Sequence, residues 1–226
     1  MNKYALIVAG GSGIRMGAGV PKQFLMLRNK PLLWYPVTAF MEAFPDIWVI
    51  LVLPEKYIDK GKAIIESTSL PQRVTTVSGG ATRFESVKNG LMHVPAGSVV
   101  FVHDGVRSLV TPALIQRCYE ATLAKGNAVP SVSAIDTIRM ETINGNERVD
   151  RTNVKIIQTP QAFFSENLKK AYQQEYKDWF TDDASVAENA GEKINLVEGD
   201  YTNIKITRQI DLVIAEQLLR QREVSG

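Results

Sequence analysis

The sequence predicts an α/β fold built on a mostly parallel sheet, and three observations support this prediction. Short runs rich in Val and Ile recur along the chain. These runs are continuously apolar rather than alternating, which is typical of strands covered on both faces. Between them lie segments with a helical apolar pattern. Strands that alternate with helices need crossover connections, and these favour parallel pairing.

The elements are expected in the following order. The strand-like runs are Tyr4–Val8, Trp48–Leu53, Val74–Val77, Ser98–His103 and Ala128–Val132. The helical segments between them are Pro31–Ala43, whose proline suits a first turn, Thr82–Leu91 and Pro112–Ala124. After these we expect a helix from about Ser165, a helix capped by Asp182-Asp183, a strand near Lys193–Val197 and a closing helix from about Arg208.

A β-hairpin is expected in the second half of the chain. Two extended segments flank Asn144-Gly145, and Asn-Gly is the strongest short hairpin signal. Because a lone hairpin is marginally stable in water, this one needs a partner surface. A second subunit is the simplest candidate, and the alternative is a hairpin that folds back on its own domain.

The composition is that of an ordinary globular protein. The 226 residues, 45% of them hydrophobic and 22% charged, suit one large domain or one domain with an appendage. The net charge of +2 gives no bulk electrostatic reason to bind nucleic acid or a membrane. The single cysteine, Cys118, excludes an internal disulfide and is expected to be a packed thiol. No apolar run approaches the roughly 20 residues of a membrane span, so we expect a soluble cytoplasmic protein.

The segment "ALIVAGGSGIRMGAGVPKQF", residues 5–24, places glycines directly after the first strand. Glycines there let backbone N–H groups approach an anion, most often a phosphate. The loop lacks the Gly-Lys-Ser/Thr of a P-loop, and Gly11-x-Gly13 lacks the third glycine of a dinucleotide fingerprint, which disfavours NAD. With backbone donors, Arg15 and Lys22 could hold a polyphosphate and stabilise charge during nucleotidyl transfer. They could equally be solvated cations beside a turn.

Two further junctions add candidate ligand groups. In "SGGATRFESV", Gly79-Gly80 and Ser86 could form a wall of the site, and the alternative is helix capping alone. "VFVHDGVR" places Asp104 at the end of a strand, where open α/β sheets bind ligands. Asp104 could hold a hard cation such as Mg²⁺, and Arg107 could meet a second anion. We interpret His103 as a packed histidine rather than a metal ligand.

The remaining candidates are cations, hydroxyls and a carboxylate spread over later loops. They are Asp136, Thr137, Arg151, Thr159, Lys205 and Arg208. As a set they suit a phosphorylated, hydroxylated substrate, although each alone is also an ordinary surface group. No Ser-His-Asp order and no close carboxylate pair indicates an acid–base dyad.

Taken together, the motifs resemble the nucleotidyltransferases that activate sugar and polyol phosphates. Within them the chain is similar to the 2-C-methyl-D-erythritol 4-phosphate cytidylyltransferase family of the non-mevalonate isoprenoid pathway. The motifs span nearly the whole chain: "AGGSGIRM", "PKQF", "GGATRFESV", "HDGVR", "DTI", "VDR", "QTPQAF", "TDDAS" and "VEGDYTNIKITR". The resemblance implies a Rossmann-like three-layer fold, one nucleotidyltransferase domain over residues 1–226, and transfer of CMP from CTP to methylerythritol phosphate with release of pyrophosphate. Because the attacking phosphate oxygen is already anionic, no strong general base is needed.

The resemblance also implies roles for individual residues. The implied catalytic residues are Arg15, Lys22, Lys205 and Arg151. The implied nucleotide-binding residues are Ala9, Gly10, Gly11, Gly13, Gly80, Arg83 and Ser86. The implied polyol phosphate-binding residues are Asp104, Arg107, Thr137, Arg151, Thr159 and Lys205, with Asp104 also facing Mg²⁺.

In this family a hairpin arm completes the site of a second subunit. The resemblance therefore implies a homodimer formed through residues 137–153 of this chain. The chain departs from the family pattern at three places. Ala9-Gly10-Gly11 replaces the common Ala-Ala-Gly, Gly105-Val106 replaces the Ala-Ala of "HDAAR", and Ala81 replaces an acidic residue. The last change removes one possible contact to the nucleotide or to its loop.

Rival functions share some of these features. Ribitol 5-phosphate cytidylyltransferases resemble the same loops, but "VDR" and "DDAS" favour methylerythritol phosphate. A hexose 1-phosphate nucleotidyltransferase fits less well, and an NAD-dependent oxidoreductase lacks its fingerprint. A regulatory protein that binds nucleotide without turnover is disfavoured because Arg15, Lys22 and Lys205 are all present. Pyrophosphate release would separate these alternatives.

Overall fold

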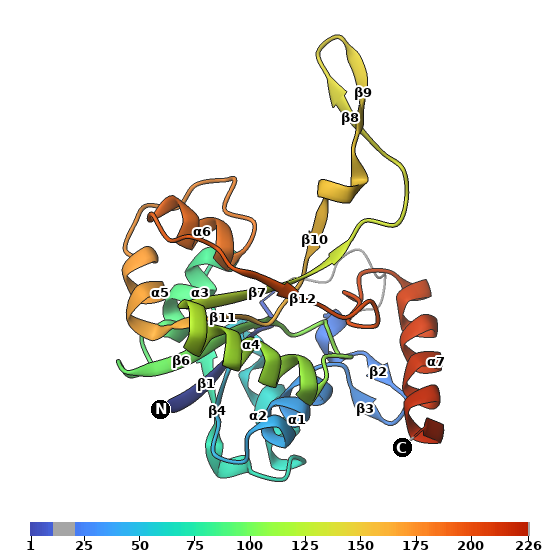
Figure 1. Cartoon of the computed structure of the whole chain (residues 1–226). Helices are drawn as coiled ribbons and strands as arrows, with labels where there is room; N and C mark the ends of the chain where they lie inside the picture. Colours follow the sequence, from blue (N-terminus) through green and yellow to red (C-terminus); the bar gives the residue numbers. More distant parts are fainter. Residues whose placement is uncertain (11–20, 226) are drawn as a thin grey trace.

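The computed structural model describes residues 1–10 and 21–225, and its centre is an eight-stranded sheet (Figure 1). The strand order is β10-β7-β11-β6-β1-β4-β5, and β12 pairs with β7. The strands are β1 (Asn2–Val8), β4 (Trp48–Leu53), β5 (Val74–Ser78), β6 (Ser98–Asp104), β7 (Asn127–Ser133), β10 (Lys155–Ile157), β11 (Gln161–Phe164) and β12 (Leu196–Glu198). The helices are α1 (Trp34–Ala43), α2 (Ile58–Glu66), α3 (Arg83–Leu91), α4 (Pro112–Lys125), α5 (Ser165–Ala171), α6 (Asp183–Asn189) and α7 (Gln209–Ser225). The α/β class and the mostly parallel sheet are therefore confirmed.

The sheet combines parallel and antiparallel pairs. Strand β1 runs parallel to both β4 and β6, and β5 runs parallel to β4. Strand β11 runs antiparallel to β6 and β7, and β10 runs antiparallel to β7. Val8 at the end of β1 lies opposite Val52 and Asp104. The carboxyl ends of β1, β4 and β6 thus meet at one edge, where open α/β sheets bind ligands.

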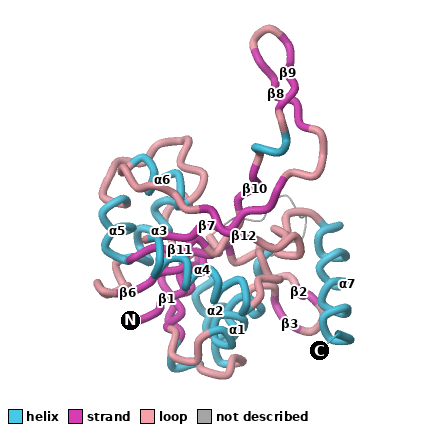
Figure 2. Tube along the Cα trace, in the orientation of Figure 1, coloured by secondary structure: helices cyan, strands magenta, loops and turns pink. Residues whose placement is uncertain are grey.

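Alternate residues of the central strands face two separate cores. Ala5 and Ile7 pack with residues of α1, α2 and α4, whereas Leu6 packs with residues of α3, α5 and α6. Figure 2 shows these helices on both sides of the strands. Because both faces are covered, both sets of side chains are apolar, and the expectation from the continuously apolar runs is confirmed.

A smaller core lies under the C-terminal helix. Leu27 of β2 (Met26–Leu27), Leu109, Ile206 and Ala215 of α7 are buried together. The short strand β2 pairs with β3 (Lys30–Pro31), and α7 packs beside this ribbon. Among the described helices, none combines the length and apolarity needed to span a bilayer.

The Asn-Gly hairpin is confirmed as a pair of antiparallel strands. They are β8 (Ile138–Thr142) and β9 (Gly145–Val149). Figure 1 shows this hairpin projecting away from the sheet and its helices. Residues 137–153 are called the arm below. The arm carries exposed apolar side chains, Met140 and Ile143 among them, and it does not fold back on its own domain.

Two expectations about helices need correction. The helix expected from Pro31 begins at Trp34, because Pro31 pairs with Met26 in the β2–β3 ribbon. Helix α2 was not indicated by the sequence. It holds only nine residues, and Gly61 near its middle weakens its helix propensity.

We predict that Cys118 is unreactive in the native protein. Its side chain is fully buried, and burial raises the pKa of its thiol to about 12. Because the thiolate is the reactive form, an aromatic disulfide reagent at pH 8 should label the thiol only as the chain unfolds. Labelling rates in increasing urea should therefore follow the unfolding transition measured by circular dichroism. Rapid stoichiometric labelling without denaturant would contradict the burial.

Candidate active site

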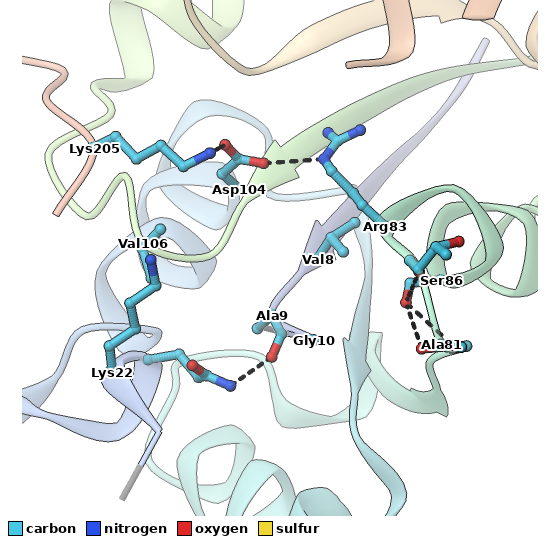
Figure 3. A pocket seen from close by; sticks show the side chains of 13 residues that line it. Val8, Ala9, Gly10, Lys22, Ala81, Arg83, Ser86, Asp104, Val106 and Lys205 are labelled. Carbon is cyan, nitrogen blue, oxygen red and sulfur yellow. Dashed lines mark hydrogen bonds and ion pairs between the residues drawn. The ribbon is translucent and has the colours of Figure 1, made fainter. Parts of the chain in front are cut away.

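The carboxyl ends of β1 and β6 open into a cavity of about 420 Å³ (Figure 3). This volume is in the range of small-molecule sites. Its walls come from five places: the end of β1, the turn after the glycine loop, the start of α3, the end of β6 and the segment before α7. The lining residues are Val8, Ala9, Gly10, Lys22, Gln23, Gly80, Ala81, Thr82, Arg83, Ser86, Asp104, Val106 and Lys205.

A second hollow, of about 260 Å³, shares part of this wall. Arg83, Asp104 and Lys205 line both spaces. The other residues of the second hollow are Arg107, Ile157, Gln158, Thr159, Gln161, Thr181 and Asp182. Two adjoining spaces with a common charged wall can hold two anionic reactants side by side.

Asp104 is the centre of this charged wall. Its Oδ2 lies 2.7 Å from Lys205 Nζ and 4.0 Å from Arg107 Nε, and its Oδ1 lies 3.4 Å from Arg83 Nε. Figure 3 shows Lys205 and Arg83 approaching the carboxylate from opposite sides. Burial alone would raise the pKa of Asp104, but Arg83, Lys205 and Arg107 together hold it well below its usual range. The carboxylate is therefore ionised at neutral pH.

Arg83 is held from behind by a buried carboxylate. Its guanidinium donates to both oxygens of Asp183, with NH1 at 3.2 Å from Oδ1 and NH2 at 2.7 Å from Oδ2. Tyr172 donates its hydroxyl to Asp183 Oδ1 at 2.7 Å. Asp183 is fully buried, so these partners are what satisfies its charge. Asp183, Arg83, Asp104 and Lys205 thus form a row of alternating charge, called the charge row below.

The expected cap of α6 needs a correction that follows from this contact. Asp182 alone is the N-cap, accepting from the Ser185 backbone N–H at 2.9 Å. Asp183 is the first residue of the helix and points to Arg83 instead. Gln161 holds this helix start, because its Nε2 donates to Asp182 Oδ2 at 2.8 Å and its Oε1 accepts from Ala184 N at 2.7 Å.

His103 and Thr159 fix the backbone at Asp104. The His103 Nε2–H donates to the Arg107 carbonyl at 3.1 Å, which leaves Nδ1 to accept from the Thr159 hydroxyl at 3.0 Å. Thr159 Oγ1 in turn accepts from the Asp104 N–H at 3.1 Å. Burial lowers the pKa of His103 to about 4, which agrees with the neutral ring that this arrangement requires. His103 is thus a packed, hydrogen-bonded histidine, as expected.

Gly80 and Ser86 form the wall next to α3. The Gly80 N–H donates to Ser86 Oγ at 3.1 Å, and that hydroxyl donates to the Thr82 carbonyl at 2.8 Å. A Cβ at position 80 would lie 2.3 Å from Glu85 Cβ, so the close approach of loop and helix requires glycine there. Thr82 and Glu85 form a capping box, so the capping is confirmed, and Gly80 and Ser86 also line the cavity.

Lys22 lies on the side of the cavity opposite Ser86 (Figure 3). It begins the short 3₁₀ turn η2 (Lys22–Phe24) directly after Pro21. The neighbouring Gln23 donates from Nε2 to the Ala9 carbonyl at 2.6 Å. This bond ties the lysine's turn to the end of β1, so Lys22 and the backbone of Ala9 share one wall.

Of the candidates from the later loops, Asp136 and Arg208 line neither cavity. The site residues that the resemblance implies divide into three groups. The cavities bring together Ala9, Gly10, Lys22, Gly80, Arg83, Ser86, Asp104, Arg107, Thr159 and Lys205. Thr137 and Arg151 belong to the arm and line neither cavity, and Arg151 donates to the Ile135 carbonyl. The remaining predicted residues, Gly11, Gly13 and Arg15, lie outside the described residues.

Arg107 differs from a simple anion-binding cation. Its NH1 donates to the Asn203 carbonyl at 2.8 Å and its NH2 to the Ile157 carbonyl at 3.3 Å. Its Nε is buried and has no hydrogen-bond partner in the described part of the chain. The guanidinium therefore links the segment before α7 to the end of β10, and its Nε–H is the donor that still faces Asp104.

Sequence reasoning missed four residues that support the site. Tyr172 and Asp183 hold Arg83, while Gln158 and Gln161 flank Thr159 and hold neighbouring loops. Both glutamines belong to the "QTPQ" motif, which was considered only for its threonine. A glutamine is usually exposed, so two glutamines beside Thr159 are a weak sequence signal for a supporting role. Their burial in the fold is what reveals that role.

We predict that Thr159→Val destabilises the protein by about 2 kcal/mol, the usual cost of leaving buried polar groups unpaired. The variant would keep the shape of the side chain while depriving the Asp104 N–H and His103 Nδ1 of their partner. Urea unfolding followed by circular dichroism measures the loss. Thr159→Ser keeps the hydroxyl and should lose about 1 kcal/mol or less. Equal losses for both variants would show that the hydroxyl is not what matters.

Comparison with known proteins places these features in a family. The family model described as 2-C-methyl-D-erythritol 4-phosphate cytidylyltransferase matches residues 4–221. The enzyme of that name from Phocaeicola vulgatus is 46% identical over 219 residues, which is 97% of this chain and 100% of the relative. The enzyme of that name from Microcystis aeruginosa is 40% identical over 225 residues, which is 97% of this chain and 99% of the relative.

Solved structures agree with the sequence relatives. The 4-diphosphocytidyl-2C-methyl-D-erythritol synthase of Anaerococcus prevotii has a TM-score of 0.83 and 28% identity, covering 97% of this chain and 98% of its own. The 2-C-methyl-D-erythritol 4-phosphate cytidylyltransferase of Thermus thermophilus has a TM-score of 0.75 and 30% identity, covering 97% and 100%. Fold, motifs and near-complete coverage therefore agree, and the chain belongs to the 2-C-methyl-D-erythritol 4-phosphate cytidylyltransferase family.

Proposed function

We propose that this enzyme transfers CMP from CTP to 2-C-methyl-D-erythritol 4-phosphate and releases pyrophosphate. The observation that carries the proposal is the charge row between two adjoining cavities, in a chain of this family. In the reaction, a phosphate oxygen of the polyol attacks the α-phosphorus of CTP. A new P–O bond forms as the bond from the α-phosphorus to the bridging oxygen breaks, and pyrophosphate leaves. The nucleophile is already an anion, so no proton has to be removed.

The larger cavity is the proposed CTP site. The backbone at Ala9, Gly10 and Gly80 and the Ser86 hydroxyl would meet the cytosine, and Lys22 would face the triphosphate. A pocket too shallow for a purine would explain a preference for a pyrimidine. Lys22 would stabilise the charge that gathers at the α-phosphorus, as Arg15 is proposed to do from the loop. Arg83, proposed from the resemblance to bind nucleotide, supports this wall through its bond to Asp104.

The smaller hollow is the proposed polyol phosphate site. Asp104 is ionised and would accept hydrogen bonds from the polyol hydroxyls. Lys205, whose side chain is 45% exposed, would meet the phosphate, with Arg107 and Thr159 in the adjoining wall. Because Lys205 and Asp104 border both spaces, the two substrates would meet at these residues.

A divalent cation, Mg²⁺, is proposed to accompany CTP. Among the described residues, no group of three or more His, Cys, Asp or Glu side chains could hold a metal ion by itself. Mg²⁺ is commonly bound through one or two carboxylates plus substrate phosphates, so Asp104 fits as the protein ligand. It would compete with Lys205, which contacts the same oxygen, Oδ2. When bound, the cation would neutralise negative charge on the triphosphate.

The arm is proposed to complete the site of a second copy, making a homodimer from two single-domain chains. It projects from the body, and exposed apolar residues lie along it and at its base. These include Ile135, Met140, Ile143 and Ile156. Thr137 and Arg151 line neither cavity of their own chain, so they could bind substrate only in the site of a partner chain. Cytoplasmic location and the absence of nucleic acid and membrane partners remain predictions from composition.

Pyrophosphate release with CTP, Mg²⁺ and a panel of polyol phosphates tests the function. Methylerythritol phosphate should be the best acceptor, with kcat/KM at least about tenfold above that of ribitol 5-phosphate. The CDP-linked product should be identified by mass spectrometry. A higher kcat/KM for ribitol 5-phosphate, or release that needs no acceptor, would contradict the proposal. ATP and GTP as donors check the pyrimidine preference.

Mixed dimers of Lys22→Ala and Arg151→Ala test the shared site. Each variant alone should lose at least about a hundredfold in kcat, because each site lacks one cation. In a mixed dimer, the Lys22→Ala chain still offers Arg151 to a neighbour that retains Lys22. After subunit exchange at equal concentrations, about a quarter of wild-type activity should return. Lys62→Ala, a change at an exposed lysine of α2, is the control and should retain full activity.

Confirmed exchange without recovery would contradict the crossing of the arm. Exchange can be followed by fluorescence transfer between chains labelled at their N-termini. A sedimentation measurement that finds only monomers at the assay concentration would contradict it as well.

A further inference from the structure

Lys205 lies in a segment that neither a helix nor a strand fixes. Residues 199–208 connect β12 to α7. The side chain of Lys205 nevertheless lies 2.7 Å from Asp104, at the border of both cavities. Contacts from other elements must therefore set the course of this segment. At its far end Ile206 is buried and its N–H donates to the Val106 carbonyl at 3.0 Å, so the open question is what fixes the part before Lys205.

Gln158 makes two hydrogen bonds to the backbone at the start of the segment, called the bond pair below. Its Nε2 donates to the Asp200 carbonyl at 2.8 Å, and its Oε1 accepts from the Asp200 N–H at 3.1 Å. The side chain thus pairs with one residue's backbone as a neighbouring strand would. Gln158 is itself buried, and its own N–H donates to the Pro130 carbonyl at 2.8 Å. Both ends of the amide are used, so its orientation is defined.

Gly199 makes this pairing possible. A Cβ at position 199 would lie 2.6 Å from Gln158 Oε1 and 3.0 Å from the backbone of Ser131. Gly199 N also donates to the Ser131 carbonyl at 2.9 Å. Only a residue without a side chain lets the segment pass this close to both Gln158 and β7. The glycine of "VEGDY" is therefore explained by a contact to "QTPQ".

Hydrogen bonds within the segment and to Thr159 fix the residues between Asp200 and Lys205. Asp200 Oδ1 accepts from the Thr202 N–H at 2.7 Å, and the Asp200 carbonyl accepts from Asn203 N at 2.9 Å. Asn203 is buried, and its Nδ2 donates to the Thr159 carbonyl at 2.8 Å. The segment is thus tied to residues 158 and 159 at two points within the five residues before Lys205.

We propose that Gln158 is a positioning residue for Lys205, which it places against Asp104 through the backbone of Asp200. The proposal rests on the proposed function, since it assigns Gln158 an effect on use of the polyol phosphate. Gln158 lines the smaller hollow but acts on the reaction through the segment. Loss of the bond pair would leave Lys205 present but held only through Asn203 and Ile206, with the start of its segment released.

Gln158→Glu tests the proposal with a side chain of the same shape. The change keeps an acceptor for the Asp200 N–H and sets a carboxylate oxygen against the Asp200 carbonyl. We expect kcat/KM for methylerythritol phosphate to fall about tenfold or more, with KM for CTP within about twofold of wild type. Gln158→Asn, one methylene shorter, should behave similarly, and it serves if the glutamate variant does not fold.

Gln174 offers a matched control. Like Gln158, it donates from Nε2 to the backbone, here to the carbonyls of Ala171 at 2.7 Å and Val186 at 2.8 Å, but it lines neither cavity. Gln174→Glu should lower the unfolding temperature while leaving both KM values and kcat within about twofold. Equal kinetic losses in the variants at 158 and 174 would mean that destabilisation alone causes them, and the proposal would fail.

A double-mutant cycle separates positioning from a general effect. In a Lys205→Ala background, Gln158→Glu should change kcat/KM by less than about twofold, because the group it positions is gone. A full further loss of about tenfold would overturn the proposal. If the wild-type enzyme shows no turnover with this substrate pair, the proposed function fails. Amide hydrogen exchange then tests whether Gln158 positions the segment. Amide hydrogen exchange over residues 199–206 should then accelerate in Gln158→Glu and not in Gln174→Glu. Unchanged exchange would overturn it.

Discussion

The site depends on one constraint: a carboxylate at the end of a buried strand must stay ionised. Asp104 achieves this because Lys205, Arg83 and Arg107 surround it, and their attraction outweighs the cost of burial. Arg83 also needs an opposite charge, and the fully buried Asp183 provides it. The two cations and two carboxylates of the charge row thus balance one another, while Arg107 and Lys22 add positive charge that suits anionic substrates. Removing one member of such a row leaves an uncompensated charge, which costs more than the pair contributes.

The turn at residues 158–161 connects the parts that carry this row. Gln158 holds the segment that carries Lys205, Thr159 holds the backbone of Asp104, and Gln161 holds the start of α6 beside Asp183. Each of these side chains is buried and uses donors and acceptors on two sides. Because three separate elements converge on four consecutive residues, a shift in this turn would move the cation, the carboxylate and the support of Arg83 together. We regard the turn as the part of the fold that defines the distances within the site.

The strands and helices could be predicted from the sequence better than the buried side chains that hold the site residues in place. Trp48–Leu53 matches β4 at both ends because a strand buried on both faces leaves a continuous apolar run with sharp limits. Asp104 was predicted from its place at a strand end, Lys22 from the glycine loop, and Lys205 from the cations of the later loops and the family resemblance, and all three line the larger cavity. Asp183 was mistaken for a cap because a carboxylate before a helix has two possible partners, and only the fold shows that Arg83, 100 residues earlier, is the one. Pro31 was misplaced because its fixed φ suits an edge strand as well as a first helical turn.

The antiparallel strand explains why these groups meet at one edge. Strand β11 begins at Gln161 opposite Val102, near the carboxyl end of β6. Had it run parallel to β6, its first residue would lie at the far edge of the sheet, and Thr159 could not reach Asp104. Strand β7 therefore runs parallel to β6, and β12 runs parallel to β7, so β12 ends at the same edge with Glu198 opposite Ser131. The chain leaves β12 directly into the segment that carries Lys205. One reversal of strand direction thus delivers both the supporting turn and the lysine to the end of β6, where the parallel strands already place Asp104.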